Sequence, residues 1–129
     1  MEQKNYILEI VSILLKNKSH IREIAKKGDT NHTTVIRKIK ELSEENVVDF
    51  VQEGKNKVYF LKKTSEARIY NYLAEYYQLI RTLKLYPSLR KVIEKVQQEK
   101  RVKMAILYGS YAKKIAKKGS DIDIYIVSK

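Results

Sequence analysis

The chain has 129 residues, no cysteine and one proline, and its 27 Lys and Arg residues outnumber 15 Asp and Glu, for a formal net charge of +12. This length accommodates one domain or two small ones, and the 43% hydrophobic content is that of a folded chain rather than a disordered one. The lack of cysteine excludes disulfides and thiolate metal sites. No apolar run reaches the ~18 residues of a membrane span, and the polar first residues are unlike a signal peptide. We therefore expect a cytoplasmic protein with no membrane partner.

The excess of basic residues predicts a polyanionic partner. Residues 1–63 contain 13 basic and 9 acidic side chains, whereas residues 64–129 contain 14 and 6. Charge alone does not separate a nucleic-acid partner from a merely solvated surface, so the motifs have to decide. The two histidines, His20 and His32, are too few for a histidine-rich zinc centre, and we interpret both as surface or capping residues rather than ligands.

Residues 1–63 are predicted to fold as a unit of three helices and a β-hairpin. A helix over 3–17 is followed by a short one over 21–27 that ends at Gly28, with Ser19 as its expected N-cap. Asn31 is expected to cap a third helix that runs to about Glu45. The apolar residues expected on the buried sides are Ile7, Ile10, Val11, Leu14 and Leu15 in the first helix and Val35, Ile36, Ile39 and Leu42 in the third.

The hairpin is predicted from two apolar runs, 47–51 and 58–61, joined by the turn Glu53-Gly54-Lys55-Asn56. With the segment from Ile21 to Leu42 and the following Glu-Glu-Asn-Val-Val, this order of elements makes residues 3–62 resemble the winged-helix DNA-binding domains of prokaryotic transcription regulators. The resemblance implies that the third helix enters the major groove of double-stranded DNA and that the hairpin touches the backbone or the minor groove.

The face of the third helix opposite its buried side supplies the candidate DNA contacts. At about 100° per residue, Thr33 and Arg37 are centred on that face. Arginine pairs bidentately with a guanine edge or grips a phosphate, and threonine meets a thymine methyl or a phosphate. The full set of candidate DNA-binding residues is Thr33, Thr34, Arg37 and Lys40 on the helix and Lys55 and Lys57 on the hairpin.

A different function remains open for the same residues. Winged helices also serve as protein-interaction modules, and exposed basic residues on a helix are commonly just solvated. Glu41 and Glu44 dilute the positive charge of the third helix.

Residues 64–100 are predicted to be a helical linker. Ser65 is its expected cap, and Ser88, after Pro87, is expected to open a second helix. The first helix has apolar residues at intervals of 4, 3, 4 and 3, a heptad-like spacing that suits helix pairing, and the resemblance implies a homodimer formed through it. This stripe is Ile69, Leu73, Tyr76, Ile80 and Leu83, thickened by Tyr70, Tyr72 and Tyr77; in the second helix Leu89, Val92, Ile93 and Val96 are expected to face inward.

Residues 101–129 combine a predicted buried strand, the pair Gly109-Ser110, ten further residues and Asp121-Ile122-Asp123 on a second apolar strand. This pattern resembles the signature of the minimal nucleotidyltransferases of the DNA polymerase β superfamily, over residues 102–129. Two aspartates two positions apart on a strand point to one face and can hold one or two Mg²⁺ ions, which would bridge the phosphates of a nucleoside triphosphate. The resemblance implies that Gly109 and Ser110 contact the triphosphate.

The set of catalytic carboxylates implied by this resemblance is incomplete. Active members of that superfamily supply a third carboxylate from a later strand, and no Asp or Glu follows Asp123 in this sequence. Either the chain is a shortened version of a longer protein, or the unit is degenerate and retained for binding or assembly. Lys113, Lys114, Lys117 and Lys118 either attract polyanions or form a solvated face.

The sequence thus predicts an α+β protein divided into a winged helix-turn-helix (1–63), a helical segment (64–100) and a partial nucleotidyltransferase-like β-α-β unit (101–129). The preferred prediction is that the protein is a dimeric DNA-binding transcription regulator. The alternative is a Mg²⁺-dependent nucleotidyltransferase, with Asp121 and Asp123 as catalytic metal ligands, that modifies a protein or nucleic acid. Similar small nucleotidyltransferases act beside all-helical toxins, which makes such a protein the possible acceptor.

Overall fold

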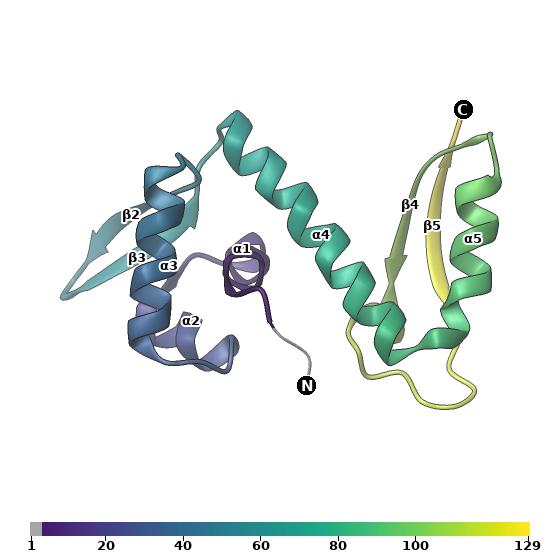
Figure 1. Cartoon of the computed structure of the whole chain (residues 1–129), viewed down its shortest axis with the longest axis horizontal. Coiled ribbons are helices and arrows are strands. Elements are labelled where there is room, and N and C mark those ends of the chain that lie inside the picture. Colours follow the sequence, from purple (N-terminus) through teal and green to yellow (C-terminus); the bar gives the residue numbers. More distant parts are fainter. Residues whose placement is uncertain (1–3) are drawn as a thin grey trace. The chain divides into compact units, whose positions relative to one another are not determined.

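The computed structural model describes residues 4–129, which form two compact units that meet within one long helix (Figure 1). The first unit extends to Tyr77, and the second is Gln78–Lys129. Helices and small antiparallel sheets together confirm the predicted α+β class. No helix in the described part of the chain is long and apolar enough to cross a membrane.

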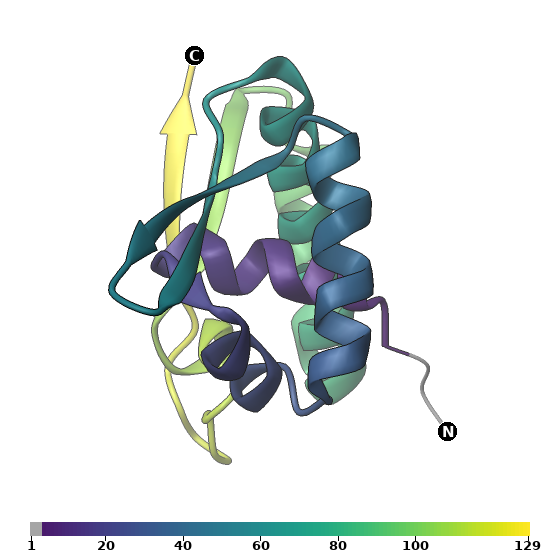
Figure 2. The same ribbon diagram turned by 90° about the vertical axis from the view of Figure 1, so that its left-hand side faces the viewer.

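The first unit is a helical bundle with a three-stranded antiparallel sheet in the order β1-β3-β2. Figure 2 shows α1 running across the long axis of α3, and the β2–β3 hairpin extending beyond them. Residue 3, the first of the predicted helix 3–17, lies outside the described residues. The elements are α1 (Tyr6–Lys16), β1 (Ser19–His20), α2 (Ile21–Lys27), α3 (His32–Glu44), β2 (Val48–Glu53), β3 (Asn56–Leu61) and the first part of α4 (Ser65–Leu85).

The core of this unit is formed where the apolar sides of its helices meet. Ile10 and Val11 of α1, Ile24 of α2, and Val35 and Leu42 of α3 are at most 1% exposed. The prediction of a buried position is wrong for two residues, because Leu15 is 40% and Ile36 is 56% exposed. Ile36 lies about 100° around the helix from Val35, which places it beyond the edge of the side that Val35, Ile39 and Leu42 bury.

The cap of α2 differs from the expected one. The helix begins at Ile21, which puts His20 and not Ser19 at the N-cap. His20 Nδ1 accepts the backbone N–H of Glu23, and Glu23 Oε1 accepts the backbone N–H of His20, a reciprocal capping box. Ser19 instead pairs with Tyr59 in the sheet, and its hydroxyl donates to the carbonyl of Asn17. Asn31 caps α3 as predicted, since its side chain accepts the N–H of Thr34 at 2.8 Å.

The hairpin has the predicted turn. Its register runs from Val48 opposite Leu61 to Glu53 opposite Asn56, which leaves Gly54 and Lys55 at the tip. Gly54 has φ +62°, the left-handed conformation that a two-residue hairpin turn requires and that glycine adopts without steric cost.

Helix α4 has two different sides. Ala67 and Ala74 are buried in the core of the first unit, whereas the predicted apolar stripe is exposed from Ile69 to Ile80. Thr64 rather than Ser65 caps the helix, because its Oγ1 accepts the N–H of Ala67. Two tyrosines expected in the stripe are on the buried side: Tyr70 packs against the core, and the hydroxyl of Tyr77 donates to Glu9 and accepts the N–H of Asn5.

The second unit contains a two-stranded antiparallel sheet, with Val102 opposite Ser128 and Tyr108 opposite Asp123. The first turn after Pro87 is a 3-10 turn that includes Ser88, so the next helix begins at Arg90 and not at Ser88. Leu89 is 1% exposed, and Tyr86 stacks edge-on against Tyr111 at 4.9 Å between ring centroids. The elements after α4 are η1 (Pro87–Leu89), α5 (Arg90–Gln98), β4 (Val102–Tyr108), α6 (Gly109–Ala112) and β5 (Asp123–Ser128).

Candidate functional site

The exposed face of α3 contains the side chains that the sequence predicted there. Val35, Ile39 and Leu42 are buried, which turns Thr33, Arg37 and Lys40 to the opposite, exposed side. Thr34 is half-buried at the edge of this face. The arrangement presents one guanidinium, one ammonium and two hydroxyls on a rigid helix anchored by its core side.

Sequence reasoning missed one residue of this face. Ile36 was assigned to the core, but it is 56% exposed on α3 beside Arg37. A β-branched side chain that is mostly in water gives the face an apolar element, which can meet a thymine methyl group. The signal was available in the sequence, because the centre of the buried side lies between Val35, Ile39 and Leu42 and about 100° from Ile36.

The hairpin carries the other predicted cations in two different settings. Lys55 lies at the exposed tip, where it makes no hydrogen bond or ion pair within residues 4–129. The ammonium of Lys57 lies 4.7 Å from the centroid of the Phe50 ring, a cation–π contact that orients its side chain. Glu53, which directly precedes the tip, is engaged by Lys18 at 2.8 Å. The tip is therefore cationic.

In the second unit the Gly-Ser pair and Asp123 are brought into contact. The strand register places Tyr108 opposite Asp123, and Gly109 follows directly at the start of α6. A Cβ atom on Gly109 would overlap Asp123 Oδ2 and lie 3.1 Å from Asp123 Cγ, and Gly109 has φ +75°. Both features require glycine at this position, so the carboxylate of Asp123 rests against the backbone of Gly109.

Asp121 departs from the expected position. The strand β5 begins at Asp123, so the two aspartates are not on one strand, and Asp121 lies exposed in the preceding loop. Gly119 with φ +88° and a hydrogen bond from the Lys117 N–H to Ser120 Oγ shape this loop. Within residues 4–129 no group of three or more His, Cys, Asp or Glu side chains is placed to hold a metal ion.

The donor set is nevertheless chemically suitable for magnesium. Mg²⁺ prefers carboxylate oxygens and is often held by one or two carboxylates together with substrate phosphates and water. Asp121 and Asp123 supply such carboxylates two positions apart, one of them fixed by its contact with Gly109. The roles of Gly109, Ser110, Asp121 and Asp123 toward a nucleotide stay predictions.

The lysines between α6 and β5 have different environments. The ammonium of Lys114 donates to the side chain of Gln78, within the same unit. Lys113, Lys117 and Lys118 are exposed. Both interpretations of this cluster, polyanion attraction and a solvated face, fit that exposure.

A comparison with known families matches the second unit to a nucleotidyltransferase. The family model described as "Polymerase beta, Nucleotidyltransferase" matches residues 90–129. The match starts at α5, so it extends the predicted region of resemblance at its N-terminal side. The predicted resemblance of the terminal segment to this superfamily is confirmed. No curated protein matches the chain.

Solved structures match the winged-helix fold. A mutant of Lactococcus lactis ZitR has a TM-score of 0.56 at 18% identity, over 74% of this chain and 70% of that chain. The PcaV transcriptional regulator of Streptomyces coelicolor, in complex with its natural ligand, has a TM-score of 0.55 at 14% identity, over 74% and 75%. Reduced HlyU of Vibrio cholerae has a TM-score of 0.50 at 19% identity, over 57% and 78%.

These likenesses and the arrangement of α1 to β3 define the class of the first unit: it is a winged helix. The chain therefore joins a winged helix to a segment that matches polymerase β-type nucleotidyltransferases. At such low identities the solved structures establish the fold, and the function has to be argued from the surfaces.

Proposed function

We propose that this protein is a DNA-binding transcription regulator whose α3 enters the major groove of double-stranded DNA. The observation that carries the proposal is the exposed outer face of α3, with Arg37 and Lys40, on the same winged-helix unit as the cationic hairpin tip. PcaV, which shares the fold, is a transcriptional regulator.

The α3 face provides both kinds of contact that sequence recognition needs. Arg37 is exposed and makes no hydrogen bond or ion pair in the described part of the chain, so its guanidinium is available for a guanine edge. Ile36 and Thr33 offer methyl groups to thymine, and Lys40 and Lys55 meet phosphates. Phosphate contacts fix the position of the helix, and the base contacts of Arg37 and Ile36 select the sequence.

The exposed stripe of α4 supports a homodimer. Ile69, Leu73, Tyr76 and Ile80 are 47–66% exposed and follow heptad-like spacing on the side of α4 opposite Ala74. Apolar side chains in such a row bury their surface when two helices pair. A dimer would present two α3 helices to two half-sites of a palindromic operator.

The test is a selection of bound duplexes from a random DNA library, followed by titrations of the selected duplex at several salt concentrations. Arg37→Ala should weaken binding by about 1–3 kcal/mol and relax one base position. Arg90→Ala, an exposed arginine in the second unit, is the matched control and should bind like the parent. Failure of the parent to enrich any sequence, with no salt-sensitive binding, would reject the proposal.

The contact between Gly109 and Asp123 favours a second candidate, a Mg²⁺-dependent nucleotidyltransferase. Bound Mg²⁺ would neutralise triphosphate charge and stabilise the attacking and leaving oxygens of an in-line displacement. Asp121 and Asp123 would hold the metal, and Gly109 and Ser110 would approach the triphosphate. A protein or nucleic acid, an all-helical toxin-type partner included, would be the acceptor. Calorimetric titration of Mg²⁺-ATP and the other triphosphates into the parent and an Asp121→Asn/Asp123→Asn variant tests this candidate, because the variant should lose the binding heat.

A further inference from the structure

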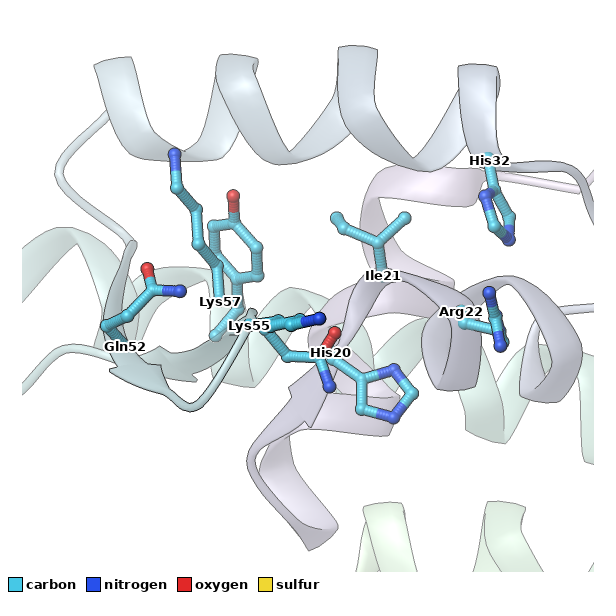
Figure 3. Close-up of a pocket in the computed structure, with 9 residues that line it drawn as sticks. His20, Ile21, Arg22, His32, Gln52, Lys55 and Lys57 are labelled. Atoms are coloured by element: carbon cyan, nitrogen blue, oxygen red, sulfur yellow. The ribbon is translucent and has the colours of Figure 1, made fainter.

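A polar pocket lies on the winged helix between the hairpin and the starts of α2 and α3. Its volume is about 460 Å³, within the range of small-ligand sites. Figure 3 shows Arg22 and His32 at one end of the pocket and Lys57 at the other. The lining residues are His20, Ile21, Arg22, His32, Gln52, Lys55, Asn56, Lys57 and Tyr59.

The charges of this pocket all have one sign. Three of its residues are permanent cations, two are histidines, and no Asp or Glu is among the described residues that line it. The side chains of Arg22 and Lys55 make no hydrogen bond or ion pair within residues 4–129, so no protein carboxylate neutralises their charge. Cations that line one pocket repel one another and are stabilised by an anion.

The other lining groups are hydrogen-bond donors suited to oxygen ligands. Gln52 and Asn56 carry side-chain amides, and partial burial raises the pKa of the Tyr59 hydroxyl, which therefore stays protonated at neutral pH. Guanidinium, ammonium, amide and hydroxyl donors are the groups that bind phosphate oxygens.

We propose that this pocket binds a phosphate group, and that in the DNA complex the group is a backbone phosphate next to the bases that α3 contacts. The assignment of this phosphate to DNA rests on the proposed function. The groups that line the pocket would bind any phosphate. The position supports the DNA source, because α3 and the hairpin, the two elements proposed to contact DNA, both border the pocket. Arg22 and His32 are thereby added to the interface.

The two histidines are held differently. His20 Nδ1 accepts the Glu23 N–H, and its Nε2 lies 3.2 Å from Glu23 Oε1, so this ring serves the helix cap. His32 is exposed at the first position of α3, and Arg22 and the hairpin lysines are the charged groups that share its pocket. Its ring is available to donate a hydrogen bond to a phosphate oxygen.

The experiment measures duplex binding by fluorescence anisotropy for the full chain, Arg22→Gln, His32→Ala and the control Arg90→Ala, across salt concentration. Arg22→Gln should weaken binding several-fold and make the slope of log K against log salt shallower by about 1 unit. His32→Ala should weaken binding through the lost ring N–H and leave the salt slope close to that of the parent. Arg90→Ala should match the parent.

Inorganic phosphate and ATP, titrated separately, distinguish a free phosphate from the DNA backbone. The NMR signals of the two histidine rings report on the pocket directly, because the chain has only His20 and His32. Movement of the His32 signal on adding duplex supports the phosphate site. If the duplex does not bind but phosphate or ATP moves the signal, the phosphate site is supported and the DNA function is rejected. Parent-like affinity and salt dependence of both variants, with Arg37→Ala still impaired and the His32 signal unmoved in the parent, would overturn the pocket and leave the proposed function standing.

Discussion

Gly109→Ala is the most discriminating perturbation of the second unit, because Gly119→Ala provides a matched control. Both glycines have positive φ, +75° and +88°, but a Cβ at Gly119 meets nothing within 4 Å, whereas one at Gly109 overlaps Asp123 Oδ2. Backbone strain is therefore common to both variants, and the collision with the carboxylate belongs to Gly109 alone.

The magnitude follows from these two terms. An alanine at positive φ costs about 1–2 kcal/mol, so Gly119→Ala should lower the free energy of unfolding by that amount. In Gly109→Ala the Asp123 side chain must also rotate, because its Cβ is fixed opposite Tyr108 in the sheet. Forcing a side chain off its rotamer costs a further ~0.5–1.5 kcal/mol.

The assays are urea denaturation followed by circular dichroism and calorimetric titration with Mg²⁺-ATP. Gly109→Ala should unfold at lower urea than Gly119→Ala, and it should lose any Mg²⁺-nucleotide binding that the parent and Gly119→Ala retain. Equal denaturation midpoints and equal nucleotide binding in the two variants would refute the inference that Asp123 is held against Gly109.

Three further predictions concern the winged helix and α4. His20→Ala should lower the free energy of unfolding by about 1 kcal/mol, measured by urea denaturation, because the cap of α2 is lost; an unchanged midpoint would contradict the capping assignment. Leu73→Glu, on the exposed side of α4, should convert a dimer to a monomer in light scattering, whereas Glu75→Gln, also exposed on α4, should not. Ile36→Ser should weaken binding to the selected duplex without loss of stability, because Ile36 is exposed; a drop in thermal midpoint would place it in the core after all.

The sequence predicts the winged helix well because its signals are local and agree with one another. The apolar period of α3, the Asn31 cap and the Gly54 turn each depend on a few neighbouring residues, and the structure confirms all three. The apolar period of a helix predicts the centre of its buried side better than the edge. Ile36 lies beyond that edge, so the prediction that it is buried is wrong. In α4 the apolar stripe is exposed and the side with Ala67 and Ala74 meets the core. Apolar spacing alone therefore does not show which side of a helix is buried.

Capping errors have a different cause. Ser19 and Ser65 are good N-cap residue types, but the cap is set by where the helix begins, and Ser19 is committed to the sheet by its pairing with Tyr59. His20 and Thr64 occupy the actual cap positions. Strand β1 is two residues long and forms only because β3 lies beside it, a long-range pairing that no local pattern contains.

The same limit applies to the candidate sites. The spacing of Gly109, Asp121 and Asp123 identified a family, but the contact of Asp123 with Gly109 depends on the register of β4 and β5. The pocket around Arg22 and His32 joins residues from α2, α3 and the hairpin that are up to 38 positions apart, from Ile21 to Tyr59. Both residues lie in the segment from Ile21 to Leu42 that resembles winged helices, but the sequence made neither of them a candidate for binding.

Pairing rather than charge count decides which cations can serve a polyanion. The larger excess of basic residues lies in residues 64–129, yet the proposed DNA surface lies in the other part of the chain. Lys18 and Lys38 face Glu53 and Glu41 at 2.8 Å and 3.6 Å, so a phosphate gains little from them. Arg37 has no such partner in the described residues, and it counts fully toward the salt dependence of binding.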